Sequence, residues 1–304
     1  MVIIHSPRCL DYAALGHPER PERVAATVAR LRTGNHTWLK PQPATDTDLL
    51  RVHDAELLRA VRTGDYFNAD TPNFADIDEI ARLAAGAAIL AAETAVAGQM
   101  AFSLMRPPGH HATHDTVMGF CYFNNLAIAV ANLLHTGKAT RIAIVDFDCH
   151  HGNGTEDIVT GNEQVLFVSL HQSPCYPGTG QFSHDNCRNF PLPPHTGPDE
   201  YLAAFDRALD EVRAFRPDVL AVSAGFDAYR GDPITEMGLE VETFGEIGAQ
   251  LAALQLPTFA VLEGGYAPSL PACVEQFVSR LSKLFRNVPC LTHERMSPFP
   301  VLWF

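Results

Sequence analysis

Residues 141–154, RIAIVDFDCHHGNG, combine a strand pattern with a polar turn, and they decide the fold. The first six residues are almost continuously apolar and β-branched, which predicts a strand covered on both faces. Similar runs stand at 2–5, 100–104, 165–170, 218–223 and 257–262. Strands buried on both faces are typical of parallel sheets, so a parallel sheet is expected.

Helical patterns separate these apolar runs. They cover residues 21–33, 54–63, 76–98, 122–135, 198–215, 240–254 and 268–286. Pro21 and Pro198 stand at the first positions of two of them, where a missing N–H costs nothing. Alternating strands and helices predict an α/β fold with an open, mostly parallel sheet flanked by helices. We expect one domain over residues 1–304.

The composition excludes several classes of function. Thirty-five acidic residues face 22 basic ones, a net charge of −13, which disfavours binding to nucleic acid or to anionic membranes. Apolar runs long enough to span a membrane are missing from the sequence. Seven dispersed cysteines without CxxC spacing, and an N-terminus without export-signal features, predict reduced thiols in the cytoplasm.

Polar segments follow four of the expected strands. They are Arg106 to His111, Asp146 to Asn153, Gly225 to Asp227, and Glu263 to Tyr266. In open parallel sheets, ligands bind beyond the carboxyl ends of the strands. The four segments are therefore expected to meet in one site.

Asp146, Asp148 and His150 alternate along the chain. If the strand continues through them, they point to one face, and burying two carboxylates with an imidazole requires a cation or mutual pairing. Asp227, after another apolar run, would be a third ligand beside Asp148 and His150. Such ligands suit Zn²⁺, with Mn²⁺ and Fe²⁺ as alternatives. The alternative is a solvent-exposed strand end whose acidic side chains are hydrated and bind no metal.

Residues 106–111, RPPGHH, form a stiff, proline-rich loop that would hold His110 and His111. Their functional interpretation is a general base beside a histidine tuned by a carboxylate, and the alternative is two solvated imidazoles. Tyr266 follows two glycines and would approach a ligand, although a packed tyrosine fits the same pattern. Phe120 and Tyr176 are candidate walls of an apolar slot.

Together these segments resemble the histone deacetylase family, which includes bacterial deacetylases and acetylpolyamine amidohydrolases. The resemblance covers about residues 15–285 and rests on six ordered blocks, at 17–23, 106–111, 119–125, 146–154, 223–227 and 263–266. It implies the arginase-like α/β fold with a central parallel sheet.

The resemblance also implies roles for single residues. Asp148, His150 and Asp227 would bind one Zn²⁺ per chain, and His111 would be the base for the attacking water. His110 would be oriented by Asp146. Asn153, where other relatives carry Asp, resembles the class II side of the family, and Tyr266 matches the tyrosine that hydrogen-bonds the developing oxyanion. A structural K⁺ is implied at the backbone oxygens of Asp146, Asp148, His150 and Leu170 and the hydroxyl of Ser169.

For the substrate, the resemblance implies an acetyl-lysine tunnel lined by Gly119, Phe120 and Tyr176. Ile234 is expected at the tunnel mouth, where polyamine-selective relatives carry a glutamate, although the nearby Glu236 would partly substitute for it. We therefore expect hydrolysis of acetyl-lysine in proteins or peptides. Acetylated polyamines and other small amides are the alternative substrates.

Two other classes of function fit the residues less well. A binuclear manganese ureohydrolase needs further carboxylates, but Gly152 and Gly225 stand at the corresponding positions. A non-catalytic acetyl-lysine-binding or zinc-binding module predicts loss of His111, Tyr266 or Asp227, and all three are present. The tail at 287–304 lies outside the resemblance and is expected to pack on its own domain or on a neighbouring subunit, so a homo-oligomer stays open.

Overall fold

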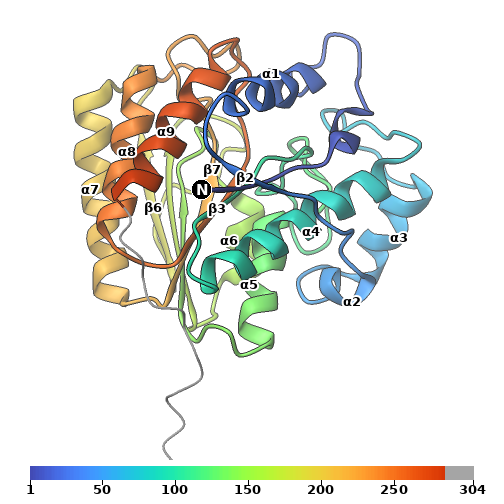
Figure 1. Ribbon diagram of the computed structural model, residues 1–304. Coiled ribbons are helices and arrows are strands. Elements are labelled where there is room, and N and C mark those ends of the chain that lie inside the picture. Colours follow the sequence, from blue (N-terminus) through green and yellow to red (C-terminus); the bar gives the residue numbers. More distant parts are fainter. Residues whose placement is uncertain (285–304) are drawn as a thin grey trace, which may run out of the picture.

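The computed structural model describes residues 1–284, and a wholly parallel eight-stranded sheet runs through them (Figure 1). The strand order is β2-β1-β3-β8-β7-β4-β5-β6. The strands are β1 (Val2–Ile4), β2 (Thr37–Leu39), β3 (Ala101–Ser103), β4 (Ile142–Asp146), β5 (Val165–Gln172), β6 (Cys187–Leu192), β7 (Val219–Ala224) and β8 (Thr258–Leu262). The predicted open parallel sheet is confirmed.

Helices cover both faces of this sheet. Figure 1 shows α7, α8 and α9 along one face and α4, α5 and α6 along the other. The helices are α1 (Pro21–Leu31), α2 (Asp46–Leu49), α3 (Ala55–Thr63), α4 (Ile77–Val96), α5 (Asn125–His135), α6 (Asn153–Val159), α7 (Pro198–Phe215), α8 (Val241–Ala253) and α9 (Leu270–Leu284), with a 3₁₀ helix η1 (Pro7–Leu10). Pro21 and Pro198 begin α1 and α7, as the sequence predicts.

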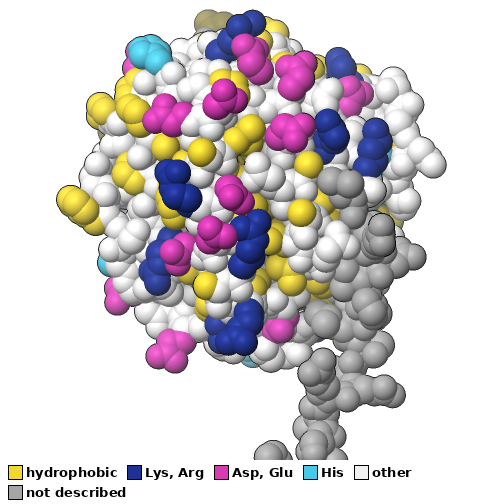
Figure 2. Space-filling view, turned by 90° about the vertical axis from the view of Figure 1, so that its left-hand side faces the viewer, with side chains coloured by type: hydrophobic (Ala, Val, Ile, Leu, Met, Phe, Trp, Pro, Cys, Tyr) yellow, Lys and Arg dark blue, Asp and Glu magenta, His cyan; other side chains and the backbone are white. Residues whose placement is uncertain are grey.

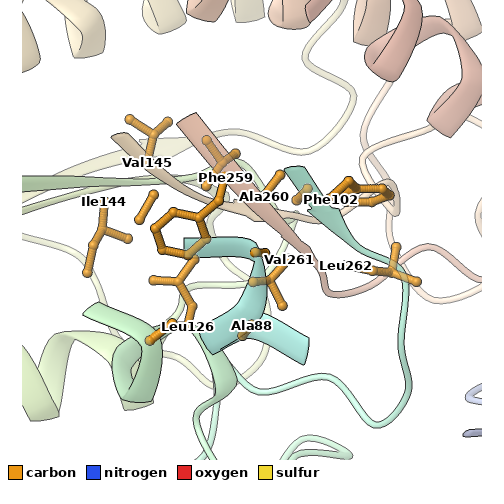
Figure 3. Close-up of a cluster of buried hydrophobic side chains, with 14 of the residues drawn as sticks. Ala88, Phe102, Leu126, Ile144, Val145, Phe259, Ala260, Val261 and Leu262 are labelled. Carbon is orange, nitrogen blue, oxygen red and sulfur yellow. The ribbon is translucent and has the colours of Figure 1, made fainter. Parts of the chain in front are cut away.

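The core lies between the sheet and the two helical layers. Every residue of β4, β5, β7 and β8 is buried. Figure 3 shows Ile144 directed toward Leu126 of α5 and Val145 directed to the opposite side of the sheet. Burial on both faces explains why these strands read as continuous apolar runs rather than as alternating patterns.

The two edge strands, β2 and β6, were not predicted from the sequence. β2 is only three residues long and partly exposed. β6 carries polar residues and Pro191. Proline is tolerated at an edge because one side of an edge strand needs no hydrogen-bonding partner. Edge strands therefore lack the continuous apolar pattern that marks the interior of the sheet.

Six of the seven cysteines lie in the part of the chain that the structure describes. Cys9, Cys121, Cys149, Cys175, Cys187 and Cys273 form no disulfide, and Cys290 and the tail at 287–304 lie outside the described residues. Of the helices in residues 1–284, none combines the length and apolarity needed to cross a bilayer. Figure 2 shows acidic and basic side chains interspersed on the side where α7 and α8 lie. A cytoplasmic location stays a prediction.

A buried ionic network joins the loops at the carboxyl edge of the sheet. Arg106 donates to both oxygens of Glu19 at 2.5 and 2.6 Å, and Arg23 donates to Glu19 at 2.8 Å. Arg23 also donates to the backbone oxygens of Glu263 and Gly265, both at 2.6 Å. All three charged side chains are nearly inaccessible to solvent. The network therefore fixes three sequence-distant segments relative to one another.

We expect Glu19→Gln to destabilise the fold by about 3–5 kcal/mol at pH 7, because two buried guanidinium groups lose their carboxylate. Burial raises the pKa of Glu19, but Arg106 and Arg23 outweigh that effect and hold it below its usual value. This stabilisation is thus fully present above the ordinary carboxyl pKa and is lost as pH falls through the folded-state pKa. Urea unfolding of the wild type and the variant at pH 7 and pH 4 measures both effects. The difference in the free energy of unfolding between the two proteins should be smaller at pH 4.

The matched control for this experiment is Glu275→Gln. Glu275 pairs with Arg30 at 2.7 Å, but both side chains are partly exposed. Exposed ion pairs contribute about 0–1 kcal/mol, so this variant should unfold almost as the wild type does. Equal losses for the two variants would contradict the importance assigned to the Glu19 network.

Candidate active site

The candidate site lies where the loops after β3, β4, β7 and β8 meet. β4 ends at Asp146, so Asp148 and His150 belong to the following loop rather than to a strand. The alternation expected if the strand continued through His150 therefore does not apply. The loop itself turns both side chains toward Asp227, which follows β7.

Asp148, His150 and Asp227 form a convergent cluster of metal-ligand type. Each offers one ligand atom, and these atoms lie within 4.8 Å of one another; in residues 1–284 this is the one such group. Nδ1 of His150 lies 2.9 Å from Oδ2 of Asp227 and 3.2 Å from Oδ1 of Asp148. All three residues are buried. Two desolvated carboxylates and an imidazole fit a divalent cation, and these donor types suit Zn²⁺.

Backbone groups hold both carboxylates of this cluster. Gly264 N–H donates to Asp148 at 2.7 Å, and Cys149 N–H donates to Asp227 at 2.8 Å. A Cβ atom on Gly264 would lie 2.4 Å from an oxygen of Asp227, and one on Gly225 would lie 2.0 Å from an oxygen of Asp148. The carboxylates can approach the backbone this closely only because glycine stands at both positions.

His110 and His111 are adjacent in sequence but have different partners. Nδ1 of His110 donates to Oδ2 of Asp146 at 3.0 Å, whereas Nδ1 of His111 donates to the amide oxygen of Asn153 at 2.7 Å. Burial lowers the pKa of His110, but Asp146 and Asp148 outweigh burial and raise it to about 10. Burial and the neighbouring His110 and His150 lower the pKa of His111. The two imidazoles are therefore biased toward opposite protonation states.

Glu263 anchors the backbone of the loop at 106–111 that carries His110 and His111, the histidine loop. Its Oε2 accepts N–H groups of Gly109 at 2.7 Å and of His110 at 3.1 Å. On the other side of the loop, the carbonyl of His110 accepts from Gly154 and Thr155 at the start of α6. The sequence predicts Glu263 only as the first residue of the turn at 263–266 that carries Tyr266, the tyrosine turn. Its signal was an acidic residue directly after a buried strand.

A narrow tunnel of about 230 Å³ leads to these groups. His111, His150 and Tyr266 are buried at its base, while Tyr176 and Ile234 are 39% and 38% exposed at its mouth. The ring of Phe120 meets the Tyr266 ring edge-on, with centroids 5.8 Å apart. The tunnel is lined by Asp70, His111, Gly119, Phe120, His150, Tyr176, Ile234 and Tyr266. The sequence-predicted wall residues thus lie together, and Glu236 is not among the lining residues.

Asp70 is a tunnel residue that the sequence analysis missed. Its Oδ1 accepts the backbone N–H of Gly119 at 3.0 Å and the hydroxyl of Thr71 at 2.8 Å. It lies in the irregular segment between α3 and α4, far in sequence from the other lining residues. That segment has no motif in the sequence, so only the tertiary contacts identify Asp70.

Asp232 and Arg23 hold Tyr266 in place. Its backbone N–H donates to Oδ2 of Asp232 at 2.7 Å, and the guanidinium of Arg23 lies 4.5 Å from its ring centroid. The preceding Gly265 has φ of 114°, which L side chains rarely adopt. Burial raises the pKa of Tyr266 well above its ordinary value, so the phenol keeps its proton at neutral pH. The phenol can therefore donate a hydrogen bond into the tunnel.

The residues implied for K⁺ are also neighbours. Asp146 of β4 and Ser169 of β5 are paired in register, and Leu170 follows Ser169. The hydroxyl of Ser169 lies 2.9 Å from Nδ1 of His171. The structure brings the backbone segments together, and the ion itself stays a prediction.

Replacing Glu263 with Leu should both destabilise the fold and slow the enzyme, because the buried N–H groups of Gly109 and His110 lose their acceptor. Each unsatisfied buried group costs about 1–3 kcal/mol. Glu263→Gln keeps an acceptor oxygen, so it should retain most of the stability and activity. Urea unfolding and steady-state kinetics of both variants test this, and a leucine variant with wild-type kcat would show that the loop needs no such anchor.

Comparison with known proteins identifies the family of this chain. Residues 17–281 match the histone deacetylase domain. A probable deacetylase of Methanothermobacter thermautotrophicus is 40% identical over 285 residues, covering 88% of this chain and 86% of that protein. A histone deacetylase-like amidohydrolase of Pseudomonas aeruginosa is 37% identical, with 89% and 78% covered. The crystal structure of an acetylpolyamine aminohydrolase from Burkholderia pseudomallei is similar with a TM-score of 0.84 at 29% identity, covering 94% of this chain and 100% of that one. The chain belongs to the histone deacetylase family, as its sequence motifs predict.

Proposed function

We propose that this chain is a zinc-dependent hydrolase of acetyl-lysine in peptides or proteins. Membership of the histone deacetylase family supports hydrolysis of an acetyl amide. The observation that carries the lysine substrate is the character of the tunnel mouth, where Ile234 offers no charge and Tyr176 supplies an aromatic wall. The neutral, flexible stem of an acetyl-lysine side chain needs apolar walls of this kind.

Asp148, His150 and Asp227 would hold the Zn²⁺ ion. Their buried carboxylates need a compensating cation, and three protein ligands leave a further coordination position open. The bound ion would supply Lewis-acid polarisation of the amide carbonyl and would make the attacking water more acidic. We also propose that a structural K⁺ binds at Asp146, Asp148, His150, Ser169 and Leu170.

In this proposal, His111 is the general base. Because its Nδ1 proton is committed to Asn153, its Nε2 carries the free lone pair that accepts a proton from water. Asn153 is neutral and does not stabilise a cationic imidazole as a carboxylate would. His110 is paired with the Asp146 carboxylate and holds its proton firmly. In this proposal, His111 accepts the proton from water, whereas His110 stays protonated.

Tyr266 would bind the oxygen of the amide as negative charge develops on it. The phenol remains protonated and lines the tunnel base with His111. A donor already oriented before the reaction stabilises developing charge without reorganisation. Arg23 above the ring and Asp232 at the backbone keep the tyrosine in place.

Acetylated polyamines are the second candidate substrates. Asp70 contributes a carboxylate to the tunnel lining, and a carboxylate attracts the distal ammonium group of a polyamine. The similar structure from Burkholderia pseudomallei is that of an acetylpolyamine aminohydrolase. Asp70 is nevertheless committed to Gly119 N–H and Thr71, which supports a role in shaping the tunnel wall.

The purified protein should contain one Zn²⁺ per chain, and Asp227→Ala should lose most of it, because two ligands remain. Inductively coupled plasma mass spectrometry measures the metal, and circular dichroism verifies the fold. Asp199→Ala, which changes an exposed carboxylate at the start of α7, is the control. Two transition metals per wild-type chain, or full zinc in Asp227→Ala, would refute the ligand set.

Tyr266→Phe should keep its zinc and its fold but lose about 10²–10³ in kcat, the usual loss for one oxyanion donor. Steady-state kinetics on an acetyl-lysine peptide measures this loss. Tyr229→Phe, at a half-buried tyrosine outside the tunnel lining, is the matched control. A Tyr266→Phe variant with near-wild-type kcat would assign the phenol a packing role only.

The wild-type enzyme should hydrolyse acetyl-lysine peptides with higher kcat/KM than acetylspermidine or acetylputrescine. Ile234→Glu should shift this ratio toward polyamines by about 1–2 kcal/mol, as expected for a partly exposed charge pair in a cleft. Ile234→Gln controls for size and polarity, because it adds no charge. If the wild type already prefers acetylpolyamines, Ile234 does not set the specificity.

A further inference from the structure

A second, larger hollow on the surface adjoins the tunnel. This groove has a volume of about 880 Å³ and shares Ile234 and Tyr266 with the tunnel. Most of its wall is apolar and comes from the segments 13–22, 231–234 and 266–268, including Leu15, Pro18, Pro21, Pro233 and Pro268. A molecule that occupies the tunnel and extends past Ile234 therefore enters this groove.

Three large apolar side chains are exposed on loops that also carry tunnel or groove residues. Leu15 is 107% exposed, Phe67 94% and Phe182 82%. Leu15 lines the groove, Phe67 lies in the segment that carries Asp70, and Phe182 lies in the one that carries Tyr176. Of the seven large hydrophobic residues exposed in the described chain, Tyr176 and Ile234 line the tunnel, and Leu15 and Ile234 line the groove. Exposed apolar side chains on these walls are available for contact with an apolar ligand.

The charges of the groove distinguish between occupants. Its ionisable side chains are His17, Arg20 and Glu22, so one fixed positive charge stands against one negative charge. A polyamine extending into the groove would need an excess of carboxylates for its ammonium groups. The groove instead offers proline and leucine, which favours a neutral, apolar occupant.

Consecutive Cα atoms are about 3.8 Å apart, so the residues that flank an acyl-lysine would lie near the tunnel mouth, where Ile234 borders the groove. We propose that the groove binds a bulky apolar side chain adjacent to the acyl-lysine in a peptide or protein substrate. This inference rests on the proposed function, and it narrows the substrate class to lysines flanked by an apolar residue.

Hydrogen bonds within the fold hold part of the groove wall in place. His17 contacts the backbone of Glu19 through Nδ1, and its Nε2 lies 3.1 Å from the carbonyl oxygen of Asp70. Glu19 itself is fixed by Arg106 and Arg23. A rigid wall loses little conformational freedom on binding, so apolar contact there contributes efficiently to affinity.

The test compares acetyl-lysine tripeptides with Leu, Phe or Gly at the position before or after the lysine. We expect the best apolar-flanked peptide to exceed the glycine peptide about tenfold in kcat/KM, chiefly through KM. In Leu15→Ser this ratio should fall to about threefold or less. In the matched control Leu50→Ser, which changes an exposed leucine outside both the groove and the tunnel, the ratio should stay at the wild-type value.

A second measurement separates this inference from the proposed function. The non-acetylated forms of the same peptides are tested as competitive inhibitors. If the wild type hydrolyses acetylputrescine better than acetyl-lysine peptides, acetylputrescine is the substrate in this assay. Preference for acetylputrescine refutes the proposed function, yet a tenfold lower inhibition constant for the leucine peptide would still support the groove. Equal inhibition and equal kcat/KM for leucine and glycine peptides overturn the groove. A dimer in sedimentation that Leu15→Ser dissociates, without any flanking preference, would assign the groove to a second copy.

Discussion

The shared carboxylate of Glu19 is the contact on which the geometry of the site depends. Arg106 begins the histidine loop, and Arg23 holds the carbonyls on either side of the Gly264 turn. Both guanidinium groups are buried, so each needs a full set of acceptors. Because one carboxylate serves both, the histidine loop and the tyrosine turn cannot move independently. This buried network therefore constrains the distance between His111 and Tyr266, the proposed base and oxyanion donor.

The second constraint is the contrast between the partners of two adjacent histidines. Asp146 and Asn153 both bond an Nδ1 atom, but only Asp146 carries a charge. A carboxylate stabilises the protonated imidazole, whereas a neutral amide only orients the ring. Two neighbouring positions of one loop thereby acquire different proton affinities. A single-residue difference in the partner is enough to divide their roles.

The tunnel and the groove extend this organisation to the substrate. Their shared wall, Ile234 and Tyr266, places the groove directly beside the tunnel. The loop at 13–22 is held by the same Glu19 network that joins the loops at 106–111 and 263–266. Under the proposed function, a substrate side chain bound in the groove would position the amide without changing the apolar character of the tunnel.

By itself, the sequence determined the parallel sheet, the deacetylase family and the segments that meet at the site. Interior strands are apolar on both faces, and residues such as Asp148 and His150 are close because they share one short loop. Only the tertiary structure decided that Asp70 lines the tunnel, that Glu263 anchors the histidine loop and that residues 13–22 wall a groove. These contacts join residues more than a hundred positions apart or lie in segments without a motif. These contacts depend on the packing of the whole fold, so the local spacing of residues in the sequence does not predict them.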